Sequence, residues 1–214
     1  GGSSGAQMGG WFRKEIKSLD DVKGLKMRIA GFGGNVISKV GVVPQQIAAG
    51  DIYPSLEKGT IDAAEFVGPY DDEKLGFTKV AKYYYYPGWW EGTSQLHNIV
   101  NLDKWNALPK HYQAAFESAS RDSFTWVTGK YDAANGPALK RLIVAGAILK
   151  AFPQDVMESC YAAATEIYAD LAKTNAHFGK MYASMTSFRN DAVVWGQVGE
   201  LSFDSFIARM RSRG

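Results

Sequence analysis

The alternation of helical and extended segments along this chain of 214 residues predicts an α/β fold. Two further observations support this fold class. Apolar residues make up 46% of the chain and the formal net charge is only +2, as is typical of a globular domain. Long helical patterns fill the last third of the sequence, so the α/β part is expected to be followed by long C-terminal helices.

The first expected elements are a capped helical turn and a strand. Ser18 and Gly24 mark the two ends of the turn, because serine caps helix N-termini and glycine adopts the left-handed conformation that ends helices. Residues 26–30 alternate in polarity and are expected to form a strand. The glycine-rich residues 31–34 are expected to form a flexible strand-to-helix loop, and their spacing does not fit a phosphate-binding motif.

The segments that follow repeat this alternation. Gly41 and Gly59 each end a helix, and Asp51 is expected to cap the second of these helices. The remaining expected elements are a helix at 36–40, an extended piece at 42–44, a helix at 51–58, strands at 61–67 and 96–100, a helix from Asp103, a helical passage at 109–127 and 131–146, a strand at 148–152, and helices at 154–173, 178–197 and 201–211. Gly129 and Gly136-Pro137 are expected to interrupt the long helical passage.

Charge and composition exclude several classes of function. The 24 basic residues nearly balance the 22 acidic ones and form no run, so a nucleic-acid partner is not expected. No apolar stretch approaches the roughly 18 residues of a membrane-spanning helix. The single cysteine, Cys160, is expected to fill the core. The histidines show no zinc-pair spacing and no nucleophile motif is present, so the residues do not support catalysis.

The most informative part of the chain comprises residues 65–72 and 83–92, which concentrate acids, aromatic residues and turn residues. A carboxylate at the end of an apolar strand, as at Glu65, is expected to face an opening when Gly-Pro follows shortly after it. Aromatic rings close by supply rigid walls of the kind that ligand pockets use. Each ring taken singly also fits a core position, but the cluster predicts a binding site.

These two segments, together with residues 7–15, 25–29 and 51–63, closely resemble the extracytoplasmic solute receptors of TRAP transporters, the DctP-type family. Within that family the sequence is most similar to the branch that binds 2-oxo acids. The resemblance extends from about Gly5 to the C-terminus, with the motifs in family order. It implies an α/β, periplasmic-binding-protein-like lobe, part of an incomplete two-lobe receptor, with long C-terminal helices.

The resemblance also implies a division into three segments. Residues 1–64 are expected to form an α/β segment of the second lobe, residues 65–103 to return to the first lobe and the cleft, and residues 104–214 to hold a long linking helix, the last strand and the C-terminal helices. Receptors of this family carry a signal sequence and a further α/β segment before this point, so the chain is expected to be the C-terminal portion of a longer receptor. Residues 1–5 are either an expression linker or a natural turn.

Arg28 is the main candidate for substrate binding. It has apolar neighbours in a predicted strand, where an unpaired charge is expensive to bury. From the residues alone, Arg28 is either an outward-facing strand arginine or a guanidinium fork aimed at a carboxylate. In the resembling family an arginine in this motif binds the substrate carboxylate, which implies the second role.

Gln7, Glu65 and Glu91 are candidates for a cation site. All three offer oxygen ligands, which suit a sodium or calcium ion better than zinc. Without the resemblance they look like unrelated surface residues. In the 2-oxo-acid branch, residues matching Gln7 and Glu65, with the backbone carbonyl matching that of Phe66, hold a cation that bridges to the substrate, and Glu91 matches a residue of the same neighbourhood. Phe66 stands where close relatives carry tryptophan, so the pocket wall lacks an indole N–H donor.

The resemblance implies the substrate-binding component of a TRAP-type transporter. Such a receptor lies in the periplasm, captures a small monocarboxylate such as the 2-oxo acid pyruvate by closure of its lobes, and docks on membrane permease subunits. The residues expected to bind the substrate are Arg28, Phe66, Tyr70, Trp90 and Glu91. The apolar C-terminal helices imply a homodimer. A hydrolase or lyase with Glu65 or Glu91 as base, or a ligand-sensing domain of the same fold, are the alternatives left open.

Overall fold

A computed structural model describes residues 1–212 of the chain. The chain divides into two compact units, Gly1–Ala163 and Ala164–Gly214. The first unit contains both β-sheets, and the described part of the second unit is helical. Among residues 1–212, no helix is both long enough and apolar enough to cross a membrane.

The first unit is built on a mixed six-stranded sheet with the strand order β4-β3-β5-β2-β6-β8. The strands are β4 (Val43–Gln45), β3 (Lys26–Arg28), β5 (Ala63–Ala64), β2 (Gly10–Phe12), β6 (Tyr83–Tyr86) and β8 (Ile148–Ala151). Strand β2 is antiparallel to both of its neighbours, whereas the β4–β3, β3–β5 and β6–β8 pairs are parallel. The expected α/β class is therefore confirmed.

Alternation along the central strands places aromatic side chains on both faces of this sheet. Phe12 and Tyr85 pack in one apolar cluster with residues of α1 (Gly31–Lys39) and of the first turns of α6 (Gln154–Thr174). Trp11 and Tyr84 pack in a second cluster with residues of α2 (Ala49–Lys58) and the last turns of α5 (Lys110–Val144). The sheet thus lies between two helical layers, as expected for an α/β sandwich. Cys160 is buried in the first cluster, which confirms its expected role in the core.

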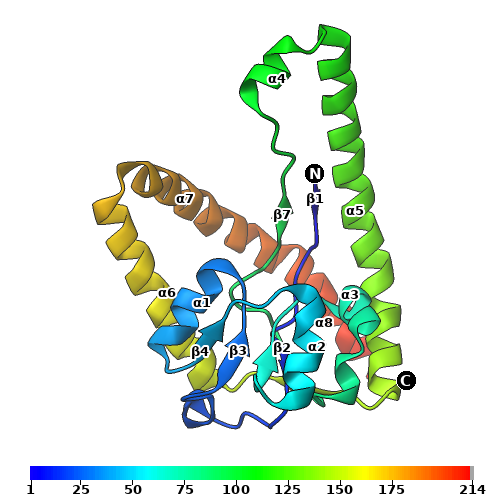
Figure 1. The fold of residues 1–214 in the computed structure, drawn as a ribbon, viewed down its shortest axis with the longest axis vertical. Coiled ribbons are helices and arrows are strands. Elements are labelled where there is room, and N and C mark those ends of the chain that lie inside the picture. The colour runs from blue at the N-terminus through cyan, green and yellow to red at the C-terminus, as the bar shows by residue number, and fades with distance from the viewer. Residues whose placement is uncertain (213–214) are drawn as a thin grey trace. The chain divides into compact units, whose positions relative to one another are not determined.

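Helix α5 extends well beyond the sheet (Figure 1), and a second, two-stranded sheet lies beside it. In this sheet β1 (Gly2–Ser3) pairs antiparallel with β7 (Gln95–Leu96), and α4 (Leu102–Ala107) follows β7. The other short elements of the first unit are η1 (Leu19–Val22), α3 (Pro69–Leu75) and η2 (Phe77–Lys79). The helical turn expected between Ser18 and Gly24 is confirmed by η1, and Gly59 ends α2 in the left-handed conformation.

Several expectations about element boundaries are wrong. Residues 31–34 form the first turn of α1 and not a flexible loop. Asp51 lies in the first turn of α2, whose N-cap is Ala48. The strand expected at 96–100 is limited to Gln95–Leu96, because β1, its partner among residues 1–212, is two residues long, and Ile99 is 94% exposed.

The interruptions expected within the long helical passage are also wrong, because α5 runs without a break over 35 residues. Pro137 removes one backbone donor, yet the helix continues through it. Ala138 and Leu142, which follow the proline, are buried. Packing of this part of α5 against the sheet therefore outweighs the unfavourable helix propensity of Gly136 and Pro137.

The second unit consists of the end of α6, α7 (Ala176–Val198) and α8 (Glu200–Arg211). The Asn175 side chain caps α7 by accepting a hydrogen bond from the Phe178 backbone N–H, at 3.0 Å. A Cβ on Gly179 would come within 2.9 Å of the Ala172 carbonyl oxygen, so glycine permits the close approach of α6 and α7. Within the described residues, α7 and α8 contain no buried residue.

Candidate functional site

The centre of the candidate site is a direct ion pair between Arg28 and Glu65. Arg28 ends β3 and Glu65 follows β5, so parallel pairing of these strands brings the two residues together. Arg28 Nη1 lies 3.0 Å from Glu65 Oε2 and also donates a 2.6 Å hydrogen bond to the Glu65 backbone carbonyl. The pair is largely buried, with side-chain exposures of 14% for Arg28 and 5% for Glu65. Both residues are candidate site residues from the sequence, but their direct contact was not predicted from it.

Burial controls the protonation of Glu65. Loss of solvent raises the pKa of its carboxyl group to about 7, and the nearby Arg28 guanidinium and the Ala30 backbone N–H oppose this shift. The negative charges of Glu91 and Asp72 raise the pKa further. Glu65 is therefore a carboxyl group that gains from any additional positive charge placed beside it.

The Arg28 side chain is held in a fixed orientation. Its Nε donates to the Ile47 backbone carbonyl at 3.3 Å, and its guanidinium lies over the Phe66 ring at 5.8 Å from the ring centre. In the described part of the chain, the hydrogen bonds of Arg28 come from Nε and Nη1. The two N–H groups of Nη2 form no hydrogen bond with the described residues, so they are the guanidinium donors that could bind a ligand.

Gln7 brings a second polar group to the same edge of the sheet. Its side-chain Nε2 donates to Ser4 Oγ at 3.0 Å, but its Oε1 is buried without a hydrogen-bond partner among the described residues. A buried amide oxygen without a partner costs free energy unless something else satisfies it. Gln7 Oε1 therefore marks a position that favours a positively charged group or a donor.

The backbone around Gln7 packs tightly against the segment that contains Glu65. The Met8 backbone N–H donates to the Val67 carbonyl at 3.1 Å. Gly10 has a φ of +104°, and a Cβ there would lie 2.6 Å from the Ala64 carbonyl oxygen. Only glycine fits this close approach, which holds the strand that follows Gln7 against the end of β5.

Trp90 and Glu91 lie in the loop that follows β6 and begins with a cis Tyr86–Pro87 peptide bond. Trp90 is half-buried and packs edge-on against Trp89, with ring centres 4.7 Å apart. The Gly88 backbone N–H donates to the Gln7 carbonyl at 2.9 Å, so this loop is anchored beside Gln7. The Glu91 carboxylate is close enough to Glu65 to influence its pKa.

Tyr70 faces different neighbours from those of Arg28. Its ring contacts the Lys74 ammonium group at 3.5 Å and the Tyr131 ring at 6.2 Å between ring centres. The Tyr70 backbone N–H donates to the Asn135 side chain at 3.1 Å. Tyr70 is thus fixed against α5 by α3, and these ring contacts are not with the Arg28–Glu65 pair.

Asp72 is a buried polar residue that the sequence analysis did not single out. Its carboxylate accepts hydrogen bonds from Trp11 Nε1 at 3.0 Å, Tyr84 Oη at 2.7 Å and the Val67 backbone N–H at 3.2 Å. Burial raises the pKa of Asp72 to about 6, although these donors oppose the shift. The sequence signal for its burial was an aspartate in a segment rich in aromatic residues, but an acid exposed to solvent fits the same pattern.

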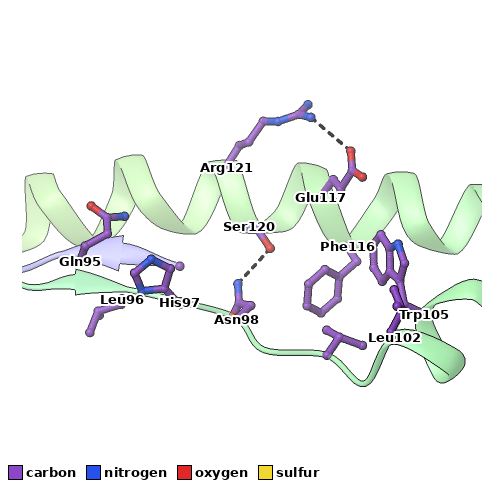
Figure 2. Close-up of a pocket in the computed structure, with 12 residues that line it drawn as sticks. Gln95, Leu96, His97, Asn98, Leu102, Trp105, Phe116, Glu117, Ser120 and Arg121 are labelled. Atoms are coloured by element: carbon purple, nitrogen blue, oxygen red, sulfur yellow. Dashed lines mark hydrogen bonds and ion pairs between the residues drawn. The ribbon is translucent and has the colours of Figure 1, made fainter. Parts of the chain in front are cut away.

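A cavity of about 530 Å³ lies elsewhere in the first unit, between the β7–α4 segment and α5. Figure 2 shows Leu102, Trp105 and Phe116 grouped at one end of this cavity, with the Asn98–Ser120 hydrogen bond and the Arg121–Glu117 ion pair farther along α5. Its walls combine apolar side chains, several of them exposed, with polar and charged side chains such as Asn98, Glu117 and Arg121. The Arg28–Glu65 pair does not line it.

The residues at the sheet edge fit a hard cation. Among residues 1–212, no three His, Cys, Asp or Glu side chains cluster as a metal site, so a soft-metal centre has no ligand set there. Gln7 Oε1 and the Glu65 carboxylate are oxygen donors, as calcium and sodium prefer. The unpartnered Gln7 oxygen is the observation that supports a cation at this position.

Comparison with known proteins places these features in a family. Residues 1–175 match the family model described as bacterial extracellular solute-binding protein, family 7 (DctP). The chain is 49% identical over 205 residues to a monocarboxylate 2-oxoacid-binding periplasmic protein of Nostoc sp., and this match covers 96% of the chain and 56% of the relative. The chain therefore spans only a little more than half the length of this relative.

Solved structures agree with this match. A TRAP transporter solute-binding protein of Bordetella bronchiseptica, described as a mixed-occupancy dimer with copurified calcium and picolinate, is 51% identical with a TM-score of 0.95. A TRAP periplasmic solute-binding protein of Colwellia psychrerythraea with bound calcium and pyruvate is 36% identical with a TM-score of 0.90. The matches cover 99% and 95% of this chain but only 63% and 62% of those structures.

The family match and the structural similarity agree with the implied periplasmic-binding-protein-like lobe. The solved relatives are solute-binding proteins, and two of them carry a small carboxylate together with calcium. This chain belongs to the family 7 bacterial extracellular solute-binding proteins, the DctP family of TRAP transporter receptors.

Proposed function

We propose that this chain is the carboxylate-binding portion of a TRAP-type solute receptor for a small 2-oxo monocarboxylate such as pyruvate. The observation that carries the proposal is the buried Arg28–Glu65 pair, whose segment is joined by backbone contacts to that of Gln7, a residue with an unpartnered side-chain oxygen among the described residues. Relatives that bind pyruvate with calcium or with sodium, each 36% identical to this chain, support the ligand class.

Arg28 would bind the substrate carboxylate. Its guanidinium is oriented by Ile47, Glu65 and the Phe66 ring before any ligand arrives, so little side-chain entropy is lost on binding. Charge-assisted hydrogen bonds of this kind contribute about 1.5–3 kcal/mol each. Phe66, Trp90 and Glu91 would complete the substrate contacts, and the proposal keeps Tyr70 as a wall residue that comes closer when the lobes close.

The cation would be held by Gln7 Oε1, the Glu65 carboxylate and the Phe66 backbone carbonyl, with Glu91 contributing nearby charge. When bound, a calcium or sodium ion supplies positive charge next to the carboxylate and oxo oxygens of the substrate. The Met8–Val67 hydrogen bond and the close approach of Gly10 to Ala64 hold the segments of Gln7 and Glu65 together, and this fixes the backbone positions of the two ligand residues.

The wider assignment follows the family. We propose a periplasmic receptor that closes two lobes on its ligand and docks on membrane permease subunits, with residues 1–64, 65–103 and 104–214 serving as the three segments of the lobes and their links. The cavity in Figure 2 and its apolar walls suit a surface that the rest of such a receptor covers. The family consists of solute-binding proteins, which argues against the hydrolase or lyase alternative.

Calorimetric titration with pyruvate tests the proposal. We expect saturable binding that is strengthened by calcium or sodium, and we expect Gln7→Leu to remove most of this cation dependence because it deletes the unpartnered oxygen. A loss of about ten-fold in affinity with calcium present corresponds to about 1.4 kcal/mol. Titrations should use this chain and a version extended to the full length of its relatives, because the matched relatives are longer.

Gln154→Leu is the matched control, because this glutamine is exposed at the start of α6. Pyruvate affinity and cation dependence should be unchanged in this variant. The 2-oxo-acid proposal fails if neither the chain nor its extended version binds pyruvate or a longer 2-oxo acid in any cation. Turnover of pyruvate would instead favour the enzyme alternative.

We also propose that α7 and α8 form a homodimer contact. Large apolar side chains are exposed along both helices, including Phe188 at 74%, Trp195 at 68% and Phe203 at 63%. An exposed apolar stretch of this extent is typical of an interface. A 51% identical relative is described as a dimer, which supports the same association.

Sedimentation velocity tests the dimer. We expect a dimer at about 50 µM protein, where an interface of standard size of about 1,600 Å² is normally occupied. The double substitution Phe188→Glu and Trp195→Glu should give a monomer, because charges replace the exposed apolar contacts. Val144→Glu is a control at an exposed apolar position on α5. A wild-type chain that sediments only as a monomer would contradict the proposal.

A further inference from the structure

Four cationic side chains surround a surface pocket of about 300 Å³ in the first unit. The pocket is lined by Arg13, Lys14, Lys79, Val80 and Lys82, so its only lining residue without a positive charge is Val80. All four cationic residues are exposed to solvent. A pocket with this lining is strongly electropositive, although the whole chain carries a formal net charge of only +2.

The strands place this basic pocket away from the Arg28–Glu65 pair. Arg13 follows β2, whose last residue, Phe12, pairs with Ala63 on one side and with Tyr83 of β6 on the other. Glu65 lies at the opposite end of the same ladder, next to Gly10. The two sites therefore lie at opposite ends of β2, and the basic pocket is not part of the proposed substrate site.

No acidic side chain neutralises the pocket from within the described chain. Among residues 1–212, Arg13, Lys14, Lys79 and Lys82 form no ion pair. The acidic residue nearest to them in sequence, Glu15, is already bound to Lys150 at 2.8 Å. Four neighbouring positive charges without a partner repel one another, and a bound anion would relieve this repulsion.

Arg13 is the positioned member of the group. A Cβ on Gly59 would come 2.8 Å from Arg13 Nη1, so the guanidinium lies directly against the C-terminal end of α2. The partial negative charge of a helix C-terminus favours a cation at this place. The Arg13 backbone is fixed as well, because its N–H donates to the Asp62 carbonyl at 3.0 Å.

We propose that this basic pocket binds a small multivalent oxyanion, with two or more adjacent negative charges. Arg13 would bind two oxygens through its planar fork, and the three lysines would act as point charges around the remaining oxygens. The volume suits a compact anion with several phosphate or carboxylate groups. Such ligands share two or more adjacent negative charges, which either phosphate groups or carboxylate groups can supply. The test therefore uses one ligand of each kind.

Calorimetry of the 214-residue chain with pyrophosphate, citrate and acetate tests the site. At an ionic strength of about 20 mM, we expect saturable binding of pyrophosphate or citrate with one anion per chain, and no saturable binding of acetate. The triple substitution Lys14→Ala, Lys79→Ala and Lys82→Ala should weaken this binding by at least about 30-fold. Raising the salt to about 200 mM should weaken binding in the wild type much more than in the variant.

Two controls establish whether binding is specific to this pocket. The triple substitution Lys104→Ala, Lys140→Ala and Lys180→Ala removes three exposed lysines elsewhere and changes the net charge equally, and it should leave binding within about two-fold. An excess of pyruvate should not compete with pyrophosphate in the wild-type chain, which makes the result independent of the proposed substrate site. Equal loss in both lysine triples, acetate binding as tight as citrate binding, or no saturable binding at low salt would overturn the proposal.

Discussion

Arg28→Ala is expected to weaken pyruvate binding by at least about 100-fold, because it removes the two Nη2 donors, whose charge-assisted hydrogen bonds contribute about 1.5–3 kcal/mol each. Hydrogen bonds to Ile47 and Glu65 already orient the Arg28 guanidinium, so the wild type loses little side-chain entropy when it binds pyruvate. The measurement is calorimetric titration with pyruvate in the presence of calcium. Removal of Arg28 also leaves Glu65 buried without its ion-pair partner.

The stability of the variant must be measured along with binding. Breaking a buried ion pair costs about 3–5 kcal/mol, and we expect the lower end because Arg28 is partly exposed. Arg28→Lys retains the charge but loses the planar guanidinium and most of its donors, so it should keep most of the stability and recover only part of the affinity. Lys26→Ala, an exposed position on the same strand, is the control for β3 itself. Pyruvate affinity in folded Arg28→Ala equal to that of the wild type would exclude the carboxylate-binding role.

Asp72→Ala is expected to destabilise the first unit by about 3–5 kcal/mol, which we would measure by urea unfolding. The substitution removes the acceptor of Trp11 Nε1–H, Tyr84 O–H and the Val67 N–H in a place where water cannot easily replace it. A buried donor left without a partner costs about 1–3 kcal/mol, and three such donors depend on this one carboxylate.

If Asp72→Ala does not fold, Tyr84→Phe tests the contribution of the Asp72 hydrogen bonds to stability instead. This substitution removes one donor to Asp72 and retains the ring that stacks on Trp11 at 3.9 Å, so the loss should be about 1–2 kcal/mol. Tyr131→Phe, which removes a hydroxyl bound to the partly buried Asp71, is the matched control and should cost less. An unfolding free energy of Asp72→Ala within about 0.5 kcal/mol of the wild type would contradict this account of the core.

Asp72 also contributes a pH dependence whose sign follows from its burial. Its pKa is about 6 in the folded state and 3.8 as the unperturbed value, so the folded protein retains a proton that the unfolded chain has released. The stability contribution of Asp72 is therefore fully present below about pH 4 and is lost as the pH rises to about 6. Asp72→Asn should remove this component, so the difference in unfolding free energy between the two proteins should change across that window. A constant difference would show that Asp72 does not titrate there.

Predictions of element boundaries succeeded where the boundary depends on local residues, and failed where it depends on a partner that is distant in sequence. The turn at Ser18 and Gly24 and the helix end at Gly59 depend on local conformational preferences, and the structure reproduces them. The strand expected at 96–100 depends on a partner, and β1 is too short to extend it. In α5, burial of Leu142 and its neighbours overrides the local signal of Pro137, and this burial does not follow from the neighbouring residues alone.

The sequence by itself determined the α/β class, the family resemblance carried by its motifs, and the selection of Arg28, Glu65 and Gln7, because these depend on residue type and order. Only the tertiary structure decided that Arg28 and Glu65 pair directly, that Gln7 Oε1 is left without a partner, and that Tyr70 packs on α5. It also decided the burial of Asp72 and the gathering of the basic pocket around Arg13. The physical reason is that charge pairing and burial depend on distances in space, which the register of strands far apart in sequence sets.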